Sequence, residues 1–181
     1  GAVPVRGPGT LPVLDRPPFA FTAARWLVRH RVRGSTRLFR WLRGAGWLDS
    51  CVDFDLGGGV TFTAPLNREP EWDAADIAEY EHLVVDALVR FARDAPGPVT
   101  LVDCGADIGL VSLKVAAGAR IDRIVAFEPS ATAWPLLAWN LDRLPGAHRA
   151  LREGVADFVG EGVLCNAAHD PSSDHARFVQ P

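Results

Sequence analysis

The sequence predicts an α/β fold of the Rossmann-like type, and three observations near its middle support this. An apolar, largely β-branched run, Val99 to Val102, is typical of a buried parallel strand and leads into a glycine-containing turn. An apolar helical segment follows at Leu110 to Ala117, and a second apolar strand, Ile124 to Phe127, ends in Glu128. Strand, glycine turn, helix, strand and acid form the first half of a nucleotide-binding βαβ unit.

Each part of this unit has a physical role. Gly105 allows a tight turn and leaves room for a ligand against the main chain. Gly109 allows the helix to begin close to the strand, with its free N–H groups facing negative charge. Glu128, at the carboxyl end of the neighbouring strand, is placed to accept both hydroxyl hydrogens of a ribose.

The glycine spacing distinguishes between nucleotides. A dinucleotide site has glycines in the pattern GxGxxG, whereas this turn has the pattern DxGxxxG from Asp103 to Gly109. The Asp103 carboxylate would repel a pyrophosphate but suits the cationic ammonium of an aminoacyl ligand. A ligand with an ammonium, a ribose and no phosphate is S-adenosylmethionine, which is the predicted cofactor.

Three segments carry a family resemblance: LVDCGADIGLVSL, IVAFEPSATAWPLLAWNL and the later Val155-Ala156-Asp157. They resemble the methyltransferases of the FkbM family, whose pattern is roughly VDVGANxGxxS, then AFEP, then a helix ending in an Asn-containing turn. Tyr80-Glu81, upstream of the first strand, resembles a Tyr-Glu pair of that family. The resemblance covers approximately Val52 to Gly162.

The resemblance implies transfer of a methyl group from S-adenosylmethionine to a hydroxyl oxygen of a small-molecule, polyketide or saccharide substrate. It implies that Asp103 and Gly105 hold the amino-acid end of the cofactor, Glu128 the ribose and Asp157 the adenine. The expected cofactor-binding set is Glu81, Asp103, Gly105, Ala106, Asp107, Gly109, Glu128, Pro129 and Asp157. Two members have an alternative: Glu81 as a solvated helix glutamate, and Asp157 as a turn-capping residue. The family usually has Asn where this chain has Asp107, which adds negative charge beside the methionine carboxylate.

The catalytic base is not identified by the sequence. His82, His169 and His175 are candidates to remove the proton of a substrate hydroxyl, with His148 as a rival. A set of imidazoles and carboxylates between His169 and His175 could bind a divalent metal, but its spacing has no recognised ligand geometry, so no metal site is expected.

Composition describes an ordinary globular protein of 181 residues, with 48% hydrophobic residues and a net charge of −3. No apolar run reaches the ~18 residues of a membrane span, and the start lacks the apolar region of a signal peptide. The three cysteines are widely spaced with no CxxC pair, which predicts neither a disulfide framework nor a zinc site. A cytoplasmic location is expected.

The predicted organisation is a basic N-terminal segment, residues 1–50, and a Rossmann-like domain, residues 51–181. The segment begins with a proline-rich arm and continues in two short amphipathic helices between Phe19 and Trp47, separated at Gly34-Ser35. It carries seven arginines and no acid between Phe19 and Trp47. Its function is open: a cap over a substrate cleft, a membrane-surface helix, a docking site for an acidic carrier protein, or a packing appendage with solvated arginines. No nucleic-acid partner is expected, and a homo-oligomer is possible.

The remaining elements follow from periodicity. Alternation of apolar and polar residues, with a glycine turn, predicts a β-hairpin over Cys51 to Pro65. Apolar residues at intervals of three and four positions predict one helix from Asp76 to Arg93. Ser130 can cap a helix that continues to Leu144, and a third strand is expected around Ala147 to Leu151. Val163-Leu164-Cys165 is a further candidate strand.

The predicted sheet is incomplete, because strands are supplied on only one side of the expected ligand crevice. The chain is therefore also open to interpretation as a piece of a longer enzyme, or as a non-catalytic binding or interaction module with a nucleotide-binding half-fold. A third alternative, an NAD-type binder, is disfavoured by the missing GxGxxG.

Overall fold

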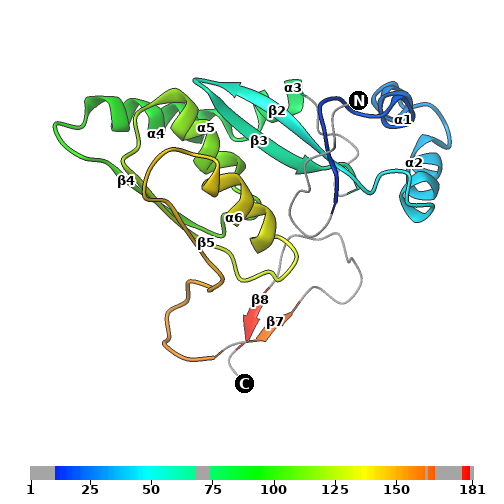
Figure 1. Ribbon diagram of the computed structural model, residues 1–181. Coiled ribbons are helices and arrows are strands. Elements are labelled where there is room, and N and C mark those ends of the chain that lie inside the picture. Colours follow the sequence, from blue (N-terminus) through cyan, green and yellow to red (C-terminus); the bar gives the residue numbers. More distant parts are fainter. Residues whose placement is uncertain (1–10, 68–73, 162, 166–176, 180–181) are drawn as a thin grey trace.

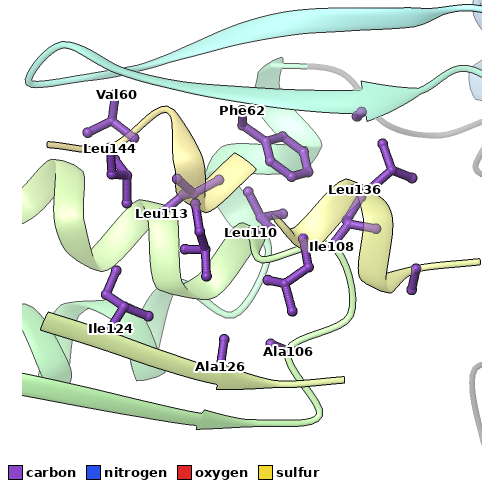
Figure 2. Packing of buried hydrophobic residues seen from close by; sticks show 14 of the residues in the cluster. Val60, Phe62, Ala106, Ile108, Leu110, Leu113, Ile124, Ala126, Leu136 and Leu144 are labelled. Atoms are coloured by element: carbon purple, nitrogen blue, oxygen red, sulfur yellow. The ribbon is translucent and has the colours of Figure 1, made fainter. Parts of the chain in front are cut away.

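The structure, a computed structural model, describes residues 11–67, 74–161, 163–165 and 177–179. Most of the described chain is stacked in layers, with a β-hairpin on one side, two helices in the middle and a parallel sheet on the other side (Figures 1 and 2). A pair of helices lies at one end of the molecule (Figure 1).

The parallel sheet has the strand order β4-β5-β6, with β4 at Thr100–Cys104, β5 at Arg123–Phe127 and β6 at Arg149–Leu151. Helix α5, Leu110–Gly118, connects β4 to β5, and helix α6, Trp134–Asp142, connects β5 to β6. Both helices pack with Ile124 and Ala126 of β5 in one core. The chain is therefore a Rossmann-like half-sheet, and the predicted α/β fold class is confirmed.

The predicted hairpin is also confirmed. Strand β2, Cys51–Gly57, pairs antiparallel with β3, Val60–Pro65, and a short strand, β1 at Val13–Leu14, pairs parallel with β2. Figure 2 shows the hairpin lying over α5 and α6, with Phe62 pointing into the space between them. Buried residues of the hairpin, the glycine loop, both helices and β5 form this main core: Val60, Phe62, Ile108, Leu110, Leu113, Ile124, Leu137 and Leu141 among others.

The two predicted basic helices are α1, Phe19–Arg29, and α2, Ser35–Gly44. They pack on each other through Phe21 and Phe39, whose rings lie 6.2 Å apart in an edge-to-face arrangement. This smaller cluster adjoins the main core, and Phe54 of β2 packs against both. The basic segment is thus attached to the hairpin through buried apolar side chains.

The prediction of one helix from Asp76 to Arg93 is wrong. The chain forms α3, Ala74–Glu79, and then α4, His82–Asp94, separated by Glu81 in a left-handed conformation with φ of 47°. The break has a partner far along the chain: the ammonium of Lys114 donates to the carbonyl oxygens of Ile77, Ala78 and Tyr80 at 2.9, 2.8 and 2.6 Å. A cation on these carbonyls ends α3, because they would otherwise lack hydrogen-bond donors.

The break also changes which side of the helix is buried. Val85 and Ala92 of α4 are buried, whereas Leu83 and Phe91, which belong to the apolar repeat of the predicted helix, are 73% and 76% exposed. The outer face of the parallel sheet is similarly open, since Thr100, Val102 and Cys104 of β4 are exposed and β4 is an edge strand. Val163–Cys165 is a strand, β7, as predicted, and it pairs with β8, Arg177–Val179, in a separate sheet.

Candidate cofactor site

The glycine loop between β4 and α5 is built from three residues in left-handed conformation. Gly105, Asp107 and Gly109 have φ values of 81°, 50° and 89°. At Gly109 a Cβ atom would lie 2.9 Å from Cδ1 of Leu137, so glycine is required there for conformation and for close packing on α6. At Gly105 a Cβ atom would meet nothing within 4 Å, so the loop is open on this side and a ligand has access to its main chain.

Hydrogen bonds fasten this loop to the end of the neighbouring strand. The N–H groups of Gly105 and Ala106 donate to the carbonyl oxygen of Phe127 at 2.9 and 3.0 Å. The N–H of Asp107 donates to Oε2 of Glu128 at 2.8 Å. The loop conformation is therefore held by the last residue of β5 and the acid that follows it.

Glu128 joins two loops at the carboxyl edge of the sheet. Its side chain is buried, and its second oxygen, Oε1, accepts from the N–H of Ser130 at 2.8 Å. A carboxylate oxygen can accept two hydrogen bonds, so each oxygen retains capacity for one more donor. The carboxylate can hold the protein loops and still accept the two hydroxyl hydrogens of a ribose.

Asp103 points toward the first turn of α5. Its Oδ2 accepts a hydrogen bond from the Ser112 hydroxyl at 2.6 Å, and its other oxygen has no hydrogen-bond partner among the described residues. Ser112 is fully buried and was not predicted as part of the site. Its position in the first turn after the glycine loop is the signal that could have identified it, because that turn faces the end of β4.

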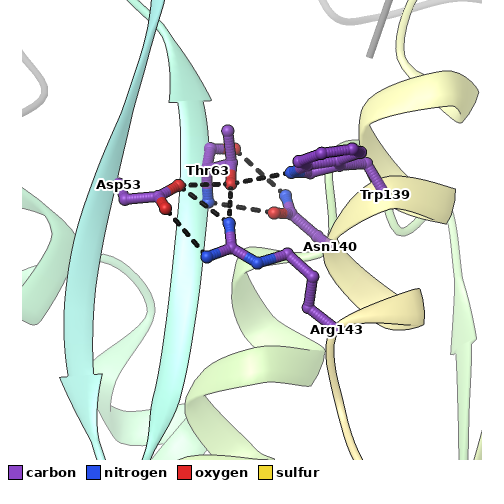
Figure 3. Close-up of polar contacts among 5 residues, drawn as sticks. All are labelled: Asp53, Thr63, Trp139, Asn140 and Arg143. Atoms are coloured by element: carbon purple, nitrogen blue, oxygen red, sulfur yellow. Dashed lines mark hydrogen bonds and ion pairs between the residues drawn. The ribbon is translucent and has the colours of Figure 1, made fainter. Parts of the chain in front are cut away.

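A polar network supports the glycine loop from the side of α6 (Figure 3). Asn140 is fully buried, and its Nδ2 donates to the carbonyl oxygens of Ile108 and Thr63 at 2.8 and 3.1 Å. Its Oδ1 accepts from the N–H of Thr63 at 2.9 Å. One amide therefore ties the glycine loop to β3, and every hydrogen-bonding group that it presents has a partner.

The same network extends to an ion pair at the hairpin. Arg143 donates through Nη1 and Nη2 to both oxygens of Asp53, at 2.9 and 2.8 Å, and lies 5.9 Å from the centre of the Trp139 ring. The Thr63 hydroxyl donates to Asp53 at 2.6 Å and accepts from Trp139 and Arg143. Burial alone would raise the pKa of Asp53, but the hydrogen bonds from Arg143 and Thr63 outweigh it and hold that pKa below its usual value.

The other predicted site residues have fewer contacts with the glycine loop. Pro129 directly follows Glu128, whereas Glu81 forms the corner between α3 and α4 with its side chain exposed. Its charge acts on Lys114, which belongs to α5, the helix that begins at the glycine loop. Asp157 is exposed in the irregular stretch after β6 and has no hydrogen-bond partner among the described residues.

Of the four histidines considered as bases, His82 and His148 have local structural contacts, and the other two lie outside the described residues. Nδ1 of His82 lies 3.0 Å from the carbonyl oxygen of Glu79. Nδ1 of His148 accepts from the N–H of Ile124 at 3.1 Å, so its Nε2 carries the proton and donates to Pro145 at 3.0 Å. The candidate bases His169 and His175 fall within the segment 166–176, which the structure does not describe.

Comparisons with known proteins give a partial similarity to solved structures. No family profile matches the chain, and no curated protein sequence matches it. Among solved structures, the chain is similar to a SAM dependent methyltransferase from Agrobacterium tumefaciens, with 18% sequence identity and a TM-score of 0.44. The similarity covers 57% of this chain and 32% of that chain, so this chain spans about a third of that protein's length. The Rossmann-like assignment itself follows from the order and register of β4, β5 and β6.

The described residues contain neither a metal-binding cluster nor a membrane-spanning helix. No group of three or more His, Cys, Asp or Glu side chains within them is placed to hold a metal ion. Among the helices that the structure describes, none is sufficiently long and apolar to cross a membrane.

Proposed function

We propose that this chain binds S-adenosylmethionine at the glycine loop and serves in methyl transfer. The observation that carries the proposal is the convergence of Asp103, the open Gly105 turn and Glu128 at one edge of the parallel sheet. This edge offers a carboxylate oxygen for an ammonium, an unobstructed main chain, and a second carboxylate for ribose hydroxyls.

The charges at this edge favour that cofactor over a dinucleotide. Asp103 and Asp107 lie within the loop, where a dinucleotide site places its pyrophosphate against glycines and a helix N-terminus, and their negative charge would repel that group. The Asp103 oxygen that accepts no hydrogen bond from the described residues is suited to an ammonium group.

In the proposed reaction the protein residues bind and align. S-adenosylmethionine, when bound, supplies a methyl group activated by its positively charged sulfur. Asp103 would hold its ammonium and Glu128 its ribose, and the network centred on Asn140 keeps the loop between them in place. Alignment of an acceptor oxygen with the methyl group and exclusion of water are the remaining requirements. The resemblance to FkbM proteins supports a hydroxyl oxygen of a small-molecule, polyketide or saccharide substrate as acceptor.

Calorimetry with S-adenosylhomocysteine, NAD and AMP in parallel tests the proposal. We expect binding of the first and none of NAD. Glu128→Ala should weaken binding by ~1–3 kcal/mol, because ribose hydroxyls lose a buried acceptor. Asp94→Ala, an exposed acid at the end of α4, is the matched control and should leave the affinity unchanged.

A deoxyribose analogue separates the ribose contact from loss of the loop conformation, since Glu128 also accepts from Asp107 and Ser130. If Glu128 binds the ribose, the variant loses less affinity for 2′-deoxy S-adenosylhomocysteine than for the parent ligand. Equal losses for both ligands would assign Glu128 to loop support alone. Preference for NAD would overturn the proposal.

A second candidate, a non-catalytic binding module, is favoured by the open outer face of the sheet. Binding of S-adenosylhomocysteine without methyl transfer to any hydroxyl acceptor tested would support this candidate.

A further inference from the structure

The outward sides of α1 and α2 combine exposed aromatic rings with arginines. On α1, Phe21 and Ala24 face the core, whereas Phe19 and Trp26 lie on the opposite side and are 86% and 57% exposed. The Trp26 ring stacks on His30, with ring centres 4.3 Å apart. Because an exposed aromatic ring leaves a large apolar area in water, this side of α1 suits a partner with an apolar surface.

Helix α2 and the turn after it repeat the pattern. Phe39 and Leu42 are buried, and helical geometry places Arg37, Arg40 and Trp41 on the opposite side. Trp41 and Trp47 are each 61% exposed, so three of the six tryptophans of the chain are exposed in this segment. Leu38 and Val32 are exposed aliphatic side chains of the same segment.

The charge of this segment is opposite to that of the rest of the chain. Residues 19–47 carry seven of the 19 basic residues and none of the 22 acidic ones, which leaves 12 basic against 22 acidic residues elsewhere. Within the described part of the chain no ion pair joins a carboxylate to any of five of these arginines: Arg31, Arg33, Arg37, Arg40 and Arg43. Their charges are available to an external anionic partner.

We propose that α1, α2 and the turn to Trp47 form a binding surface for an anionic membrane. Arginines would contact lipid phosphates, and the tryptophan rings would enter the boundary between headgroups and acyl chains, where an indole keeps its N–H near water. Exposed Leu38 and Val32 favour lipid over nucleic acid, because acyl chains accept aliphatic groups and phosphates and base stacks do not. Since α1 and α2 lie at one end of the molecule and α4 at the other, a flat surface can contact them while the acidic remainder stays away (Figure 1).

Vesicle binding by the full chain tests this surface. The protein is sedimented with vesicles of phosphatidylcholine containing phosphatidylglycerol, and with vesicles of phosphatidylcholine alone. We expect binding to the anionic vesicles that weakens as salt is raised. Quenching by brominated lipid, in a Trp72→Phe background, should reach the exposed tryptophans and be lost in the triple variant Trp26→Ser, Trp41→Ser and Trp47→Ser.

Matched arginine variants separate a specific surface from net charge. The double variant Arg37→Gln with Arg40→Gln should weaken vesicle binding about tenfold to thirtyfold. The reason is that each basic residue near an anionic surface raises the binding constant about fivefold. Arg90→Gln with Arg152→Gln removes the same charge from exposed positions outside the segment and should have little effect. All four positions are exposed, so circular dichroism should show unchanged folding.

Three results would overturn the proposal. The first is absence of binding to anionic vesicles at low salt. The second is an equal effect of the two arginine pairs. The third is vesicle binding that shows no bromolipid quenching and is abolished by polyglutamate or by an oligonucleotide. That result would assign the surface to an acidic protein or a nucleic acid instead.

Discussion

At the scale of single residues, Asp107 suits the backbone conformation of its position, but its charge is unfavourable for the proposed ligand. Its φ of 50° lies in the left-handed region, which Asn and Asp tolerate better than other residues with a Cβ. Its N–H donates to Glu128, and this main-chain hydrogen bond is retained when Asn replaces Asp. Asn therefore meets the conformational requirement of this position without its negative charge.

Asp107→Asn should retain the fold and leave the affinity for S-adenosylhomocysteine unchanged or improve it. Asn adopts the same conformation, and the substitution removes repulsion between the residue and the ligand carboxylate. Calorimetry measures the affinity, and Asp142→Asn, on the exposed side of α6, provides the control. A large loss of affinity would reveal a specific contact of the Asp107 carboxylate with the ligand.

At the scale of secondary-structure elements, Asn140 connects three of them: α6, β3 and the loop that starts α5. Removal of its amide would leave an N–H and two carbonyl groups in the interior without partners. Each such group costs on the order of 1–3 kcal/mol when it is buried, although water can enter and reduce the cost.

Asn140→Ala should lower the free energy of unfolding by about 2–4 kcal/mol. Urea denaturation followed by circular dichroism measures this change. Asp142→Ala, on the same helix but exposed, should change stability by less than about 0.5 kcal/mol. Similar losses in the two variants would show that the buried amide has no special importance.

The Asp53–Arg143 pair predicts a pH dependence of the attachment between hairpin and α6. Because the pKa of Asp53 is lowered in the folded state, its stabilising effect is complete above the unfolded pKa of about 3.9 and is lost as the pH falls through the lower folded value. The stability difference between the parent chain and Asp53→Asn should be constant above about pH 5 and shrink below pH 4. A difference that persists unchanged at pH 3 would contradict this assignment.

The elements that the sequence predicts correctly are those specified by local patterns. Alternation over β2, the left-handed glycines of the loop and the apolar runs of β4 and β5 each need only neighbouring residues. The break at Glu81 could not be predicted, because the cation that ends α3 comes from Lys114, in another element of the fold. Asn140 was missed as a site residue for a related reason, since its partners Thr63 and Ile108 become neighbours only after the layers assemble.

At the scale of the whole molecule, two apolar surfaces are uncovered in the described chain. Val102, in the middle of β4, is 58% exposed, and Leu83 and Phe91 are exposed on α4. Strand β4 is also an edge strand, because no described strand pairs with its outer side. Folded proteins avoid leaving such an edge open, so a second copy or further polypeptide is expected to cover it.

The chain of 181 residues should therefore associate in solution, and its association should depend on this sheet face. Size exclusion with light scattering measures the mass over a range of concentrations. Val102→Lys should shift the chain toward the monomer, whereas Thr36→Lys, on exposed α2, should not. A monomer at every concentration that also transfers methyl groups would disprove the expectation.

Lys114, whose ammonium ends α3, is the only lysine in the chain. Burial lowers its pKa, while Asp86, Glu79 and Glu81 oppose that change. A protein with one lysine gives a single side-chain resonance when it is grown with ¹⁵N-lysine. That resonance would report directly on the junction between the α3 corner and α5, the helix that begins at the glycine loop, so ligand binding at one end of α5 becomes observable at a single nitrogen atom.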